Sequence, residues 1–233
     1  MSIKRVSGKI VGITDLTKTA KEIRVALDNP LDFVAGAFVN IFIDIDGEKE
    51  RRAYSISSSD KEQNNISLAV RLTPKGKVTP IFWNKDLLGE RIELMGPLGV
   101  NTADKMLHEK IYLFAFGVGA GVVKSLADHF ADENGLKSLV IMTGSRFEDE
   151  IIYKEYFDNL AENYPKIKVS HIVSRPQDAS IYKKGYIQDY ISELDFSNSD
   201  IYVCGQESAC TALVEKIKLS NPINCSFFVE AFH

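Results

Sequence analysis

Four consecutive residues, Arg52-Ala53-Tyr54-Ser55, bring a cation, an aromatic ring and a hydroxyl into one segment. Alternate side chains of a strand share a face, so we expect Arg52 and Tyr54 to point at one ligand with Ser55 beside them. An arginine can hold a pyrophosphate through two parallel hydrogen bonds, and a tyrosine ring can lie along an isoalloxazine. The segment therefore predicts a flavin site, although an ordinary strand with an exposed arginine and a half-buried tyrosine would contain the same residues.

A glycine-rich loop, Gly117-Val118-Gly119-Ala120-Gly121, lies between an apolar run and an amphipathic segment of helical length. Glycines let a pyrophosphate approach the backbone at a helix N-terminus, where free amides and the helix dipole favour an anion. This context predicts a dinucleotide-phosphate site at Gly117, Val118 and Gly119. A plain turn from strand to helix is the alternative interpretation.

A second loop covers residues 73–79 and contains Gly76, Lys77, Val78 and Thr79. It precedes the one helical run expected in the N-terminal half and offers amides, lysines and a hydroxyl. These groups could bind a phosphate, and Thr79 could instead cap the helix. Both interpretations stay open, because an anion at a capped helix start uses the same free amides.

The chain has 233 residues, of which 45% are hydrophobic and 26% are charged, and its formal net charge is -4. Such a composition is typical of a globular protein long enough for two compact domains. The negative charge and the lack of a basic stripe argue against nucleic-acid binding. No apolar run reaches membrane-spanning length and the first residues lack a signal-peptide core, so we expect no membrane insertion and a cytoplasmic location.

Three cysteines, Cys204, Cys210 and Cys225, occur in the C-terminal half. Their number is odd, and their spacings match no zinc or plant-type iron–sulfur pattern. We therefore expect no metal site and three reduced thiols, with Cys210 and Cys225 buried.

The N-terminal half consists of short alternating or β-rich runs that turn residues interrupt, with one helical run at residues 79–88. This pattern is typical of an antiparallel β-barrel or sandwich. We expect strands at residues 10–13, 22–27, 37–45, 53–57, 66–72 and 91–95.

After residues 96–99, Gly-Pro-Leu-Gly, apolar runs alternate with amphipathic segments of helical length. The alternation predicts a doubly wound α/β domain with a parallel sheet. We therefore expect two domains, residues 1–103 and 104–233, with the active site at their interface. The expected strands are residues 111–116, 139–142, 169–173, 201–203 and 226–229, and the expected helices are residues 122–133, 149–163, 187–194 and 208–219.

The order of five motifs makes the chain resemble the ferredoxin-NADP reductase superfamily. The motifs are RxYS at residues 52–55, GxxS/T at 76–79, GPxG at 96–99, the glycine-rich loop at 117–121 and Cys-Gly at 204–205. The resemblance extends over essentially the whole chain. It implies that the antiparallel β-barrel binds FAD and that the α/β unit binds a nicotinamide nucleotide.

In the N-terminal unit, the resemblance assigns the FAD pyrophosphate to Arg52, the flavin ring to Tyr54 and the surroundings of flavin N5 to Ser55. Residues 76–79 would bind the FAD phosphates, and residues 70–72 would line the outer part of the cofactor. The implied FAD site therefore consists of Arg52, Ala53, Tyr54, Ser55, Val70, Arg71, Leu72, Gly76, Lys77, Val78 and Thr79.

In the C-terminal unit, the resemblance places Cys204 and Gly205 beside the nicotinamide, which makes Ser55 and Cys204 the implied catalytic residues. Phe232 resembles the terminal aromatic that covers the flavin in the family. Two departures concern the nucleotide loops. Val118 stands where many relatives have a threonine, and residues 206–207 are Gln-Glu where two prolines are usual.

Two Ser-Arg pairs bear on the choice of coenzyme. Ser174-Arg175 resembles the pair that receives the 2′-phosphate of NADP in several family members, with Ser145-Arg146 as a helper. An arginine suits a phosphate, whereas an acidic residue would suit a free 2′-hydroxyl. We therefore expect NADP, with NAD and a solvated Ser-Arg-Pro turn as the alternatives.

The motifs together predict an FAD-dependent oxidoreductase that takes a hydride from NADPH and passes electrons to a ferredoxin or flavodoxin type carrier. The chain contains no four-cysteine cluster and no globin-like half, so we expect the acceptor to be a separate protein or a free substrate. One rival is an NADH-dependent reductase component of a multi-protein oxygenase or dehydrogenase system. A non-catalytic nucleotide-binding regulator is a rival from another class.

Overall fold

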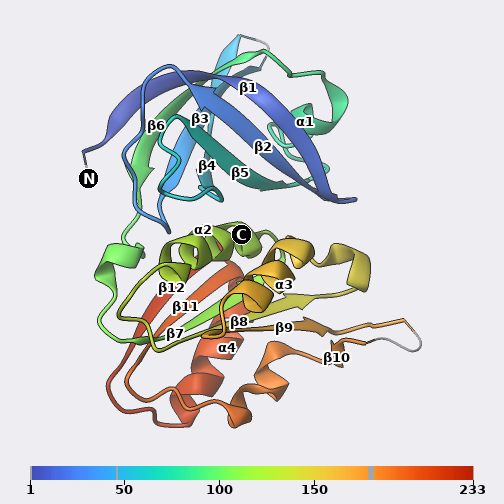
Figure 1. The fold of residues 1–233 in the computed structure, drawn as a ribbon. Helices are drawn as coiled ribbons and strands as arrows, with labels where there is room; N and C mark the ends of the chain where they lie inside the picture. Colours follow the sequence, from blue (N-terminus) through green and yellow to red (C-terminus); the bar gives the residue numbers. More distant parts are fainter. Residues whose placement is uncertain (1, 46, 178–180, 233) are drawn as a thin grey trace.

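The structure is a computed structural model that describes residues 2–45, 47–177 and 181–232. A β-barrel and an α/β unit lie against each other, with the described C-terminal end close to their interface (Figure 1). A linker with a 3₁₀ turn at Ala103–Lys105 leads from the last barrel strand to the first strand of the α/β sheet. Within the described residues, no helix is long and apolar enough to cross a membrane.

Six antiparallel strands form the barrel in the order β4-β3-β6-β1-β2-β5. Along β1, Val6 and Ile10 are buried whereas Lys9 is exposed, which is the alternation that directs apolar side chains inward. A bridge between Ile56 and Leu68 joins the two ends of the sheet and closes the barrel. The strands are β1 (Lys4–Thr17), β2 (Ala20–Leu27), β3 (Phe38–Ile45), β4 (Glu48–Ser55), β5 (Asn65–Arg71) and β6 (Arg91–Leu98).

The α/β unit contains a parallel sheet in the order β10-β9-β8-β7-β11-β12. Helices α2 and α3 pack against one core cluster and α4 against another, so the central strand β7 is buried along most of its length. The elements are β7 (Lys110–Phe116), α2 (Ala120–Ala131), β8 (Ser138–Ser145), α3 (Lys154–Asn163), β9 (Ile167–Val173), β10 (Lys183–Lys184), β11 (Ser199–Gln206), α4 (Glu207–Leu219) and β12 (Cys225–Phe232).

The strand order reverses beside β7, because β8 follows it on one side and β11 lies on the other. In open α/β sheets, ligands bind in the crevice at the carboxyl ends of the strands at such a switch point. The glycine-rich loop lies at the carboxyl end of β7, where a 3₁₀ turn at Gly117–Gly119 leads into α2. The predicted barrel and doubly wound sheet are confirmed, and the nucleotide loop lies at the edge where such sheets bind ligands.

The helix expected at residues 79–88 was predicted too long. Only Ile81–Asn84 form α1, and the backbone is extended at Lys85. Beyond that point the Asp86 carboxylate accepts a hydrogen bond from the Leu88 amide at 3.1 Å, which offers the chain a local alternative to further helical turns. Gly89 then has a φ of 83° and turns the chain into β6.

The helix expected at residues 187–194 was wrong. Two 3₁₀ turns, Ile187–Asp189 and Ile191–Glu193, occupy the segment, and their backbone bonds join residues three apart, such as Tyr190 N to Ile187 O at 3.0 Å. The Asp189 carboxylate accepts the Tyr186 amide at 2.8 Å and fixes the first turn. The two-residue strand β10 (Lys183–Lys184) precedes the first turn and pairs with β9. The sequence did not predict this strand.

Helix α2 carries much of the contact between the two units. The Ser125 hydroxyl donates to the backbone oxygen of Ser58 at 2.8 Å, and His129 Nδ1 lies 2.7 Å from Asp60 Oδ2. Residues 58–60 follow the Arg-Ala-Tyr-Ser segment, and α2 follows the glycine-rich loop. These contacts therefore fix the two nucleotide motifs relative to each other.

Candidate active site

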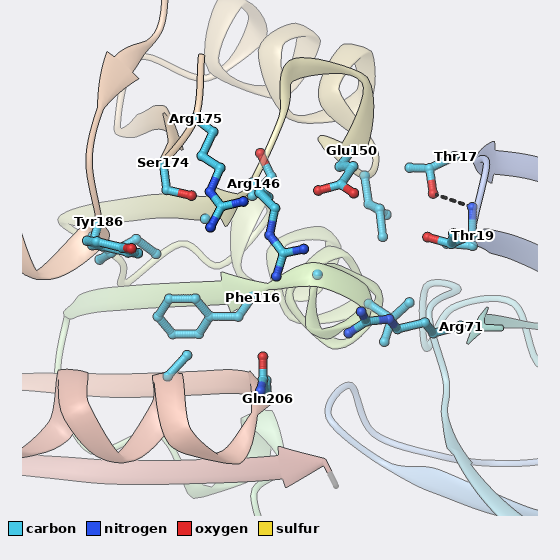
Figure 2. A pocket seen from close by; sticks show the side chains of 18 of the residues that line it. Thr17, Thr19, Arg71, Phe116, Arg146, Glu150, Ser174, Arg175, Tyr186 and Gln206 are labelled. Carbon is cyan, nitrogen blue, oxygen red and sulfur yellow. Dashed lines mark hydrogen bonds between the residues drawn. The ribbon is translucent and has the colours of Figure 1, made fainter. Parts of the chain in front are cut away.

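A cleft of about 430 Å³ opens between the barrel and the carboxyl ends of the α/β strands (Figure 2). The α/β unit lines it with Gly117 and Val118 of the glycine-rich loop and with the loops that follow β8 and β9. The barrel contributes Thr17, Thr19 and Arg71. Both units therefore shape this space, as the predicted interface site requires.

The two Ser-Arg pairs lie side by side at the edge of the cleft. The Ser174 amide donates to the backbone oxygen of Ser145 at 3.0 Å, and the Arg175 amide donates to that of Arg146 at 2.8 Å. Figure 2 shows both arginine side chains directed toward the same part of the cleft, with Ser174 beside them. The structure therefore brings together the four residues that the sequence proposed for one phosphate.

Three guanidinium groups, those of Arg71, Arg146 and Arg175, belong to residues that line the cleft. Among the described residues, no carboxylate forms an ion pair with any of them, although Glu150 also lines the cleft. An arginine is well suited to a phosphate, because its planar fork offers two parallel donors. The cleft can therefore hold a polyanionic ligand from two sides.

The glycine-rich loop packs directly on the loop after β11. A Cβ on Gly119 would overlap the backbone carbonyl of Cys204, and a Cβ on Gly205 would overlap that of Phe116. Gly205 also has a φ of 138°, which side chains of L-residues rarely allow. These two glycines are required by backbone packing at the switch point, and they bring Cys204 close to the start of the nucleotide loop.

A carboxylate joins the two predicted catalytic residues. The Ser55 hydroxyl donates a hydrogen bond to Glu230 Oε1, and Glu230 lies opposite Cys204 in the register of β12 and β11. Burial raises the pKa of Glu230 above its usual value of 4.5, and the hydrogen bond from Ser55 opposes that shift. The arrangement can hold a proton where the barrel meets the sheet.

The Cys204 thiol is buried, with 1% of its surface exposed. Burial raises its pKa well above the usual value of 9.0, and the neighbouring carboxylate of Glu230 acts in the same direction. The thiol therefore stays protonated at neutral pH, and it lacks the thiolate character of a nucleophile. Of the other two thiols, Cys210 is buried as expected, whereas Cys225 is only partly buried near the start of edge strand β12.

The phosphate motifs of the barrel meet at Glu50. The Glu50 carboxylate forms ion pairs with Arg52 at 3.0 Å and with Lys77 at 2.9 Å, and hydrogen bonds from these cations lower the pKa of Glu50. The strand that carries Arg52 and the loop that carries Gly76 and Lys77 are therefore adjacent. The carboxylate occupies the position of an anion between two cations, so the donor set fits a phosphate.

Several predicted FAD residues direct their side chains into the barrel. Val70 and Val78 belong to the buried core, so only their backbone atoms could face a ligand. Tyr54 is half-buried against the same core, and burial raises its pKa to about 12. Ala53 is exposed and pairs with Asn40 in the ladder between β4 and β3.

Thr79 closes its own loop and does not cap α1. Its hydroxyl accepts a hydrogen bond from the Thr73 amide at 2.9 Å and donates to the Thr73 carbonyl at 3.2 Å. The N-cap of α1 is Pro80, and it makes no side-chain cap bond. The Leu72 amide, at the start of the loop, donates to the Thr19 carbonyl at 2.8 Å. Residues 72–79 therefore form a ring-like loop anchored on the β1–β2 turn.

Phe232 ends β12, where it is opposite Gln206 in the strand register. It is half-buried and packs against the core cluster that includes residues of α2, so it is anchored in the sheet. Gln206 lines the cleft, which places the Gln-Glu departure beside the nucleotide loop (Figure 2). Residue 233 lies outside the described residues.

Sequence reasoning missed three residues that the structure places at the site. Tyr186 and Gln188 line the cleft, and 65% of the Tyr186 surface is exposed. Glu230 was missed as the partner of Ser55, although an acidic residue within the apolar run of β12 is a signal, since burying a carboxylate needs compensation. Arg71 was expected along FAD, and the structure places it in the cleft.

Two protein-family models match the chain. The model described as "Oxidoreductase FAD-binding domain" matches residues 7–102, and the model described as "Oxidoreductase NAD-binding domain" matches residues 113–215. The first covers the barrel and the second covers most of the α/β unit. Each family match therefore corresponds to one of the two sheets of the structure.

Two proteins with related chains are electron-transfer proteins by name. The electron transfer component of toluate 1,2-dioxygenase from Pseudomonas putida is 26% identical over 215 residues, which are 91% of this chain and 62% of that protein. The electron transfer subunit of dihydroorotate dehydrogenase B (NAD(+)) from Fusobacterium nucleatum is 30% identical over 190 residues, 78% of this chain and 68% of the relative. The chain spans between 49% and 68% of such relatives.

A solved structure supports the fold. The ferredoxin NADP+ reductase from Neisseria gonorrhoeae, determined with bound FAD and NADP, has a TM-score of 0.84 at 14% identity, and the match covers 99% of both chains. The chain belongs to the ferredoxin-NADP reductase superfamily of FAD- and NAD-binding oxidoreductases. The resemblance inferred from the motifs is thereby confirmed, as are FAD and a nicotinamide nucleotide as its cofactors.

Proposed function

We propose that this chain is an NADPH-dependent reductase that passes electrons through FAD to a separate electron-carrier protein. One observation carries the proposal: a cleft lined by three arginines lies at the switch point beside β7, and Ser55 contacts Glu230 on the β12 side of that point. The first feature suits the phosphates of a nucleotide, and the second lies where the barrel meets the sheet. A coenzyme across the end of β7 would reach both.

Bound FAD would supply the redox chemistry, since a flavin accepts a hydride from a nicotinamide and can release electrons singly. Arg52 and Lys77 are proposed to hold its pyrophosphate, with Glu50 displaced from between them. Tyr54 is proposed to pack on the ring. The position of Ser55, at the end of β4 and in contact with β12, supports its role beside the reacting edge.

The coenzyme is proposed to lie with its ribose phosphate between Arg146 and Arg175 and its pyrophosphate near Gly117 and Arg71. These residues line one cleft, which supports the assignment. The exposed ring of Tyr186 at the rim could stack on the adenine. Two arginines close to a 2′-phosphate favour NADPH over NADH, because only NADPH carries that group.

Around the reacting atoms, Glu230 is proposed to hold a proton and to orient the Ser55 hydroxyl. Cys204, kept as a buried thiol, would pack beside the nicotinamide and exclude water from it. Bringing the two ring systems together in a dry interface is the main contribution that a protein makes to hydride transfer. No other general acid or base is required.

For the acceptor, two candidates have support. The sequence motifs favour a ferredoxin or flavodoxin type carrier. The names of the relatives favour the reductase role in a multi-protein oxygenase or dehydrogenase system. Mixing the reduced protein with purified ferredoxin, flavodoxin or an oxygenase component and following flavin reoxidation would separate the two. We further propose a cytoplasmic location and a domain division after residue 103.

The decisive experiment is an absorption spectrum of the purified protein with and without NADPH. The proposal expects a yellow protein whose flavin band is bleached under anaerobic conditions and restored by an electron acceptor. A protein that binds the nucleotide but is never reduced by NADPH or NADH would instead be the non-catalytic regulator. NADH in a parallel cuvette distinguishes the coenzymes.

A further inference from the structure

One residue next to the cleft has a strained backbone. Tyr153, at the N-cap of α3, has a φ of 57° and a ψ of 32°, which is the left-handed helical region. A bulky side chain in this region is uncommon and strained, so it persists only where the surrounding structure enforces it. The strain therefore points to contacts that hold Tyr153 in place.

The contact of its hydroxyl crosses the domain interface. Tyr153 Oη donates a hydrogen bond to Glu22 Oε2 of β2 at 2.7 Å, between residues 131 positions apart in the chain. Burial raises the pKa of Tyr153 well above its usual value, so the phenol remains a donor at neutral pH. The Lys124 ammonium lies 5.8 Å from the centre of the ring and adds a cation–π contact.

Each partner of this bond is close in sequence to a wall of the cleft. On the barrel side, Glu22 pairs with Ala69 in the antiparallel ladder between β2 and β5. The pair Ala20 and Arg71 lies two residues away in the same ladder, toward the start of β2 and the end of β5. Ala20 and Arg71 line the cleft. The Glu22 carboxylate is therefore anchored on the same strand pair that presents Arg71.

On the α/β side, Tyr153 ends the segment that begins with Arg146. Arg146, Glu150 and Ile152 of this segment all line the cleft. The segment is held at its other end by the backbone bond between Arg175 and Arg146. A second link to the barrel, between Lys18 and Asp149, is largely exposed to solvent, so it contributes little.

We infer that Tyr153 is a positioning residue that sets the distance between Arg71 and Arg146 across the cleft through its hydrogen bond to Glu22. The inference rests on the proposed function, since it concerns the affinity of that cleft for the coenzyme. Without the bond, the segment from residue 146 to 152 loses a buried polar attachment to the barrel and keeps its apolar packing there. Coenzyme binding then has to order it, and affinity falls.

The test compares Tyr153→Phe with Tyr156→Phe in the flavin-loaded protein. Tyr156 is a matched control, because its hydroxyl also donates to a carboxylate, Asp128 Oδ1 at 2.6 Å, but that contact stays within the α/β unit. The dissociation constants of NADP+ and NAD+ are measured by difference absorption of the oxidised flavin. Thermal unfolding and the flavin reduction rate at saturating NADPH are measured on the same samples.

For Tyr153→Phe we expect the dissociation constant of the preferred nucleotide to rise about three- to tenfold, the range for losing part of one hydrogen bond to a charged group. The reduction rate at saturating NADPH and the flavin content should stay within twofold of wild type. Tyr156→Phe should lower the melting temperature and leave the dissociation constant unchanged. Glu22→Ala should reproduce the Tyr153→Phe effect, and Glu22→Gln, which retains an acceptor oxygen, should restore most of the affinity.

The outcomes separate the two proposals. If wild type binds a nicotinamide nucleotide and Tyr153→Phe binds it equally well, the positioning role is overturned and the proposed function stands. Equal losses in Tyr153→Phe and Tyr156→Phe would also overturn it, since both would then act through general stability. If wild type binds neither nucleotide, the proposed function fails and the inference fails with it.

Discussion

The Ser55 hydroxyl on β4 donates a hydrogen bond to the carboxylate of Glu230 on β12, which connects the flavin motif of the barrel to the edge strand of the α/β sheet. Glu230 also lies opposite Cys204 in the strand register. Three polar or ionisable side chains from two domains therefore meet at one point.

Ser55→Ala should slow reduction of the flavin by NADPH at least tenfold and leave FAD bound. We expect this because the hydroxyl is proposed to act at the reacting ring, where about 1.4 kcal/mol in the barrier is a factor of ten. Anaerobic stopped-flow absorption measures the rate. Ser59→Ala is the matched control, since the Ser59 hydroxyl accepts a hydrogen bond from the Lys61 amide within its own turn. A loss of rate below twofold in Ser55→Ala would contradict the proposed role.

Glu230 should make the protein less stable as the pH rises. Its folded-state pKa is raised above the usual 4.5 by burial, so the folded state binds more protons than the unfolded state between these two values. The stabilisation is fully present below about pH 4.5 and is lost as the pH rises through the raised pKa. Urea unfolding at a series of pH values should show this decline in wild type. The decline should be smaller in Glu230→Gln, and identical profiles would show that Glu230 is not the group responsible.

Arg52→Ala should reduce the amount of FAD that remains bound after purification. A charged contact to a diphosphate typically contributes about 1.5 to 3 kcal/mol, and Glu50 cannot replace the lost cation. The ratio of flavin absorbance to protein measures retention. Arg51→Ala removes the neighbouring exposed arginine and serves as the control. Full flavin content in Arg52→Ala would mean that Arg52 is only a surface residue paired with Glu50.

Arg175→Ala should weaken the use of NADPH far more than the use of NADH. The ratio of the two kcat/KM values should fall about ten- to a hundredfold, because only NADPH presents the additional phosphate. Steady-state kinetics with both coenzymes measure the ratio. Lys168→Ala removes an exposed cation from β9 outside the cleft and should change nothing. Equal losses with both coenzymes, or a wild type that prefers NADH, would remove the assignment of Arg175 to the 2′-phosphate.

The sequence could predict the parts of the site that depend on local motifs. The Ser-Arg pairs follow parallel strands, and the carboxyl ends of such strands meet at one edge, so their convergence follows from the sequence pattern alone. The outward direction of Arg71 was also accessible, because Val70 is a core residue and the next side chain of a strand faces the other way. The family resemblance implies that Arg71 lines the outer part of FAD, and this role stays a prediction.

Other features could not be predicted, because they depend on contacts between distant segments. Glu230 and Ser55 are 175 positions apart, and no spacing rule relates them. The failed helix at residues 187–194 has a different cause. There the Asp189 side chain binds the Tyr186 amide, and this local bond favours a tight turn over a continuous helix. The spacing of apolar residues alone does not reveal that a side-chain hydrogen bond competes with a continuous helix.

The reversal of strand order beside β7 has a consequence for how this chain could diverge. The loops with Arg146 and Arg175 follow β8 and β9 on one side of the central strand, whereas Cys204 and Glu230 belong to β11 and β12 on the other. Substitutions that retune coenzyme preference would therefore arise in a different part of the molecule from those that alter the reacting centre. Evolution or protein engineering could therefore exchange the loops after β8 and β9 to change the preferred coenzyme. The residues of the reacting centre on β11 and β12 would stay unchanged.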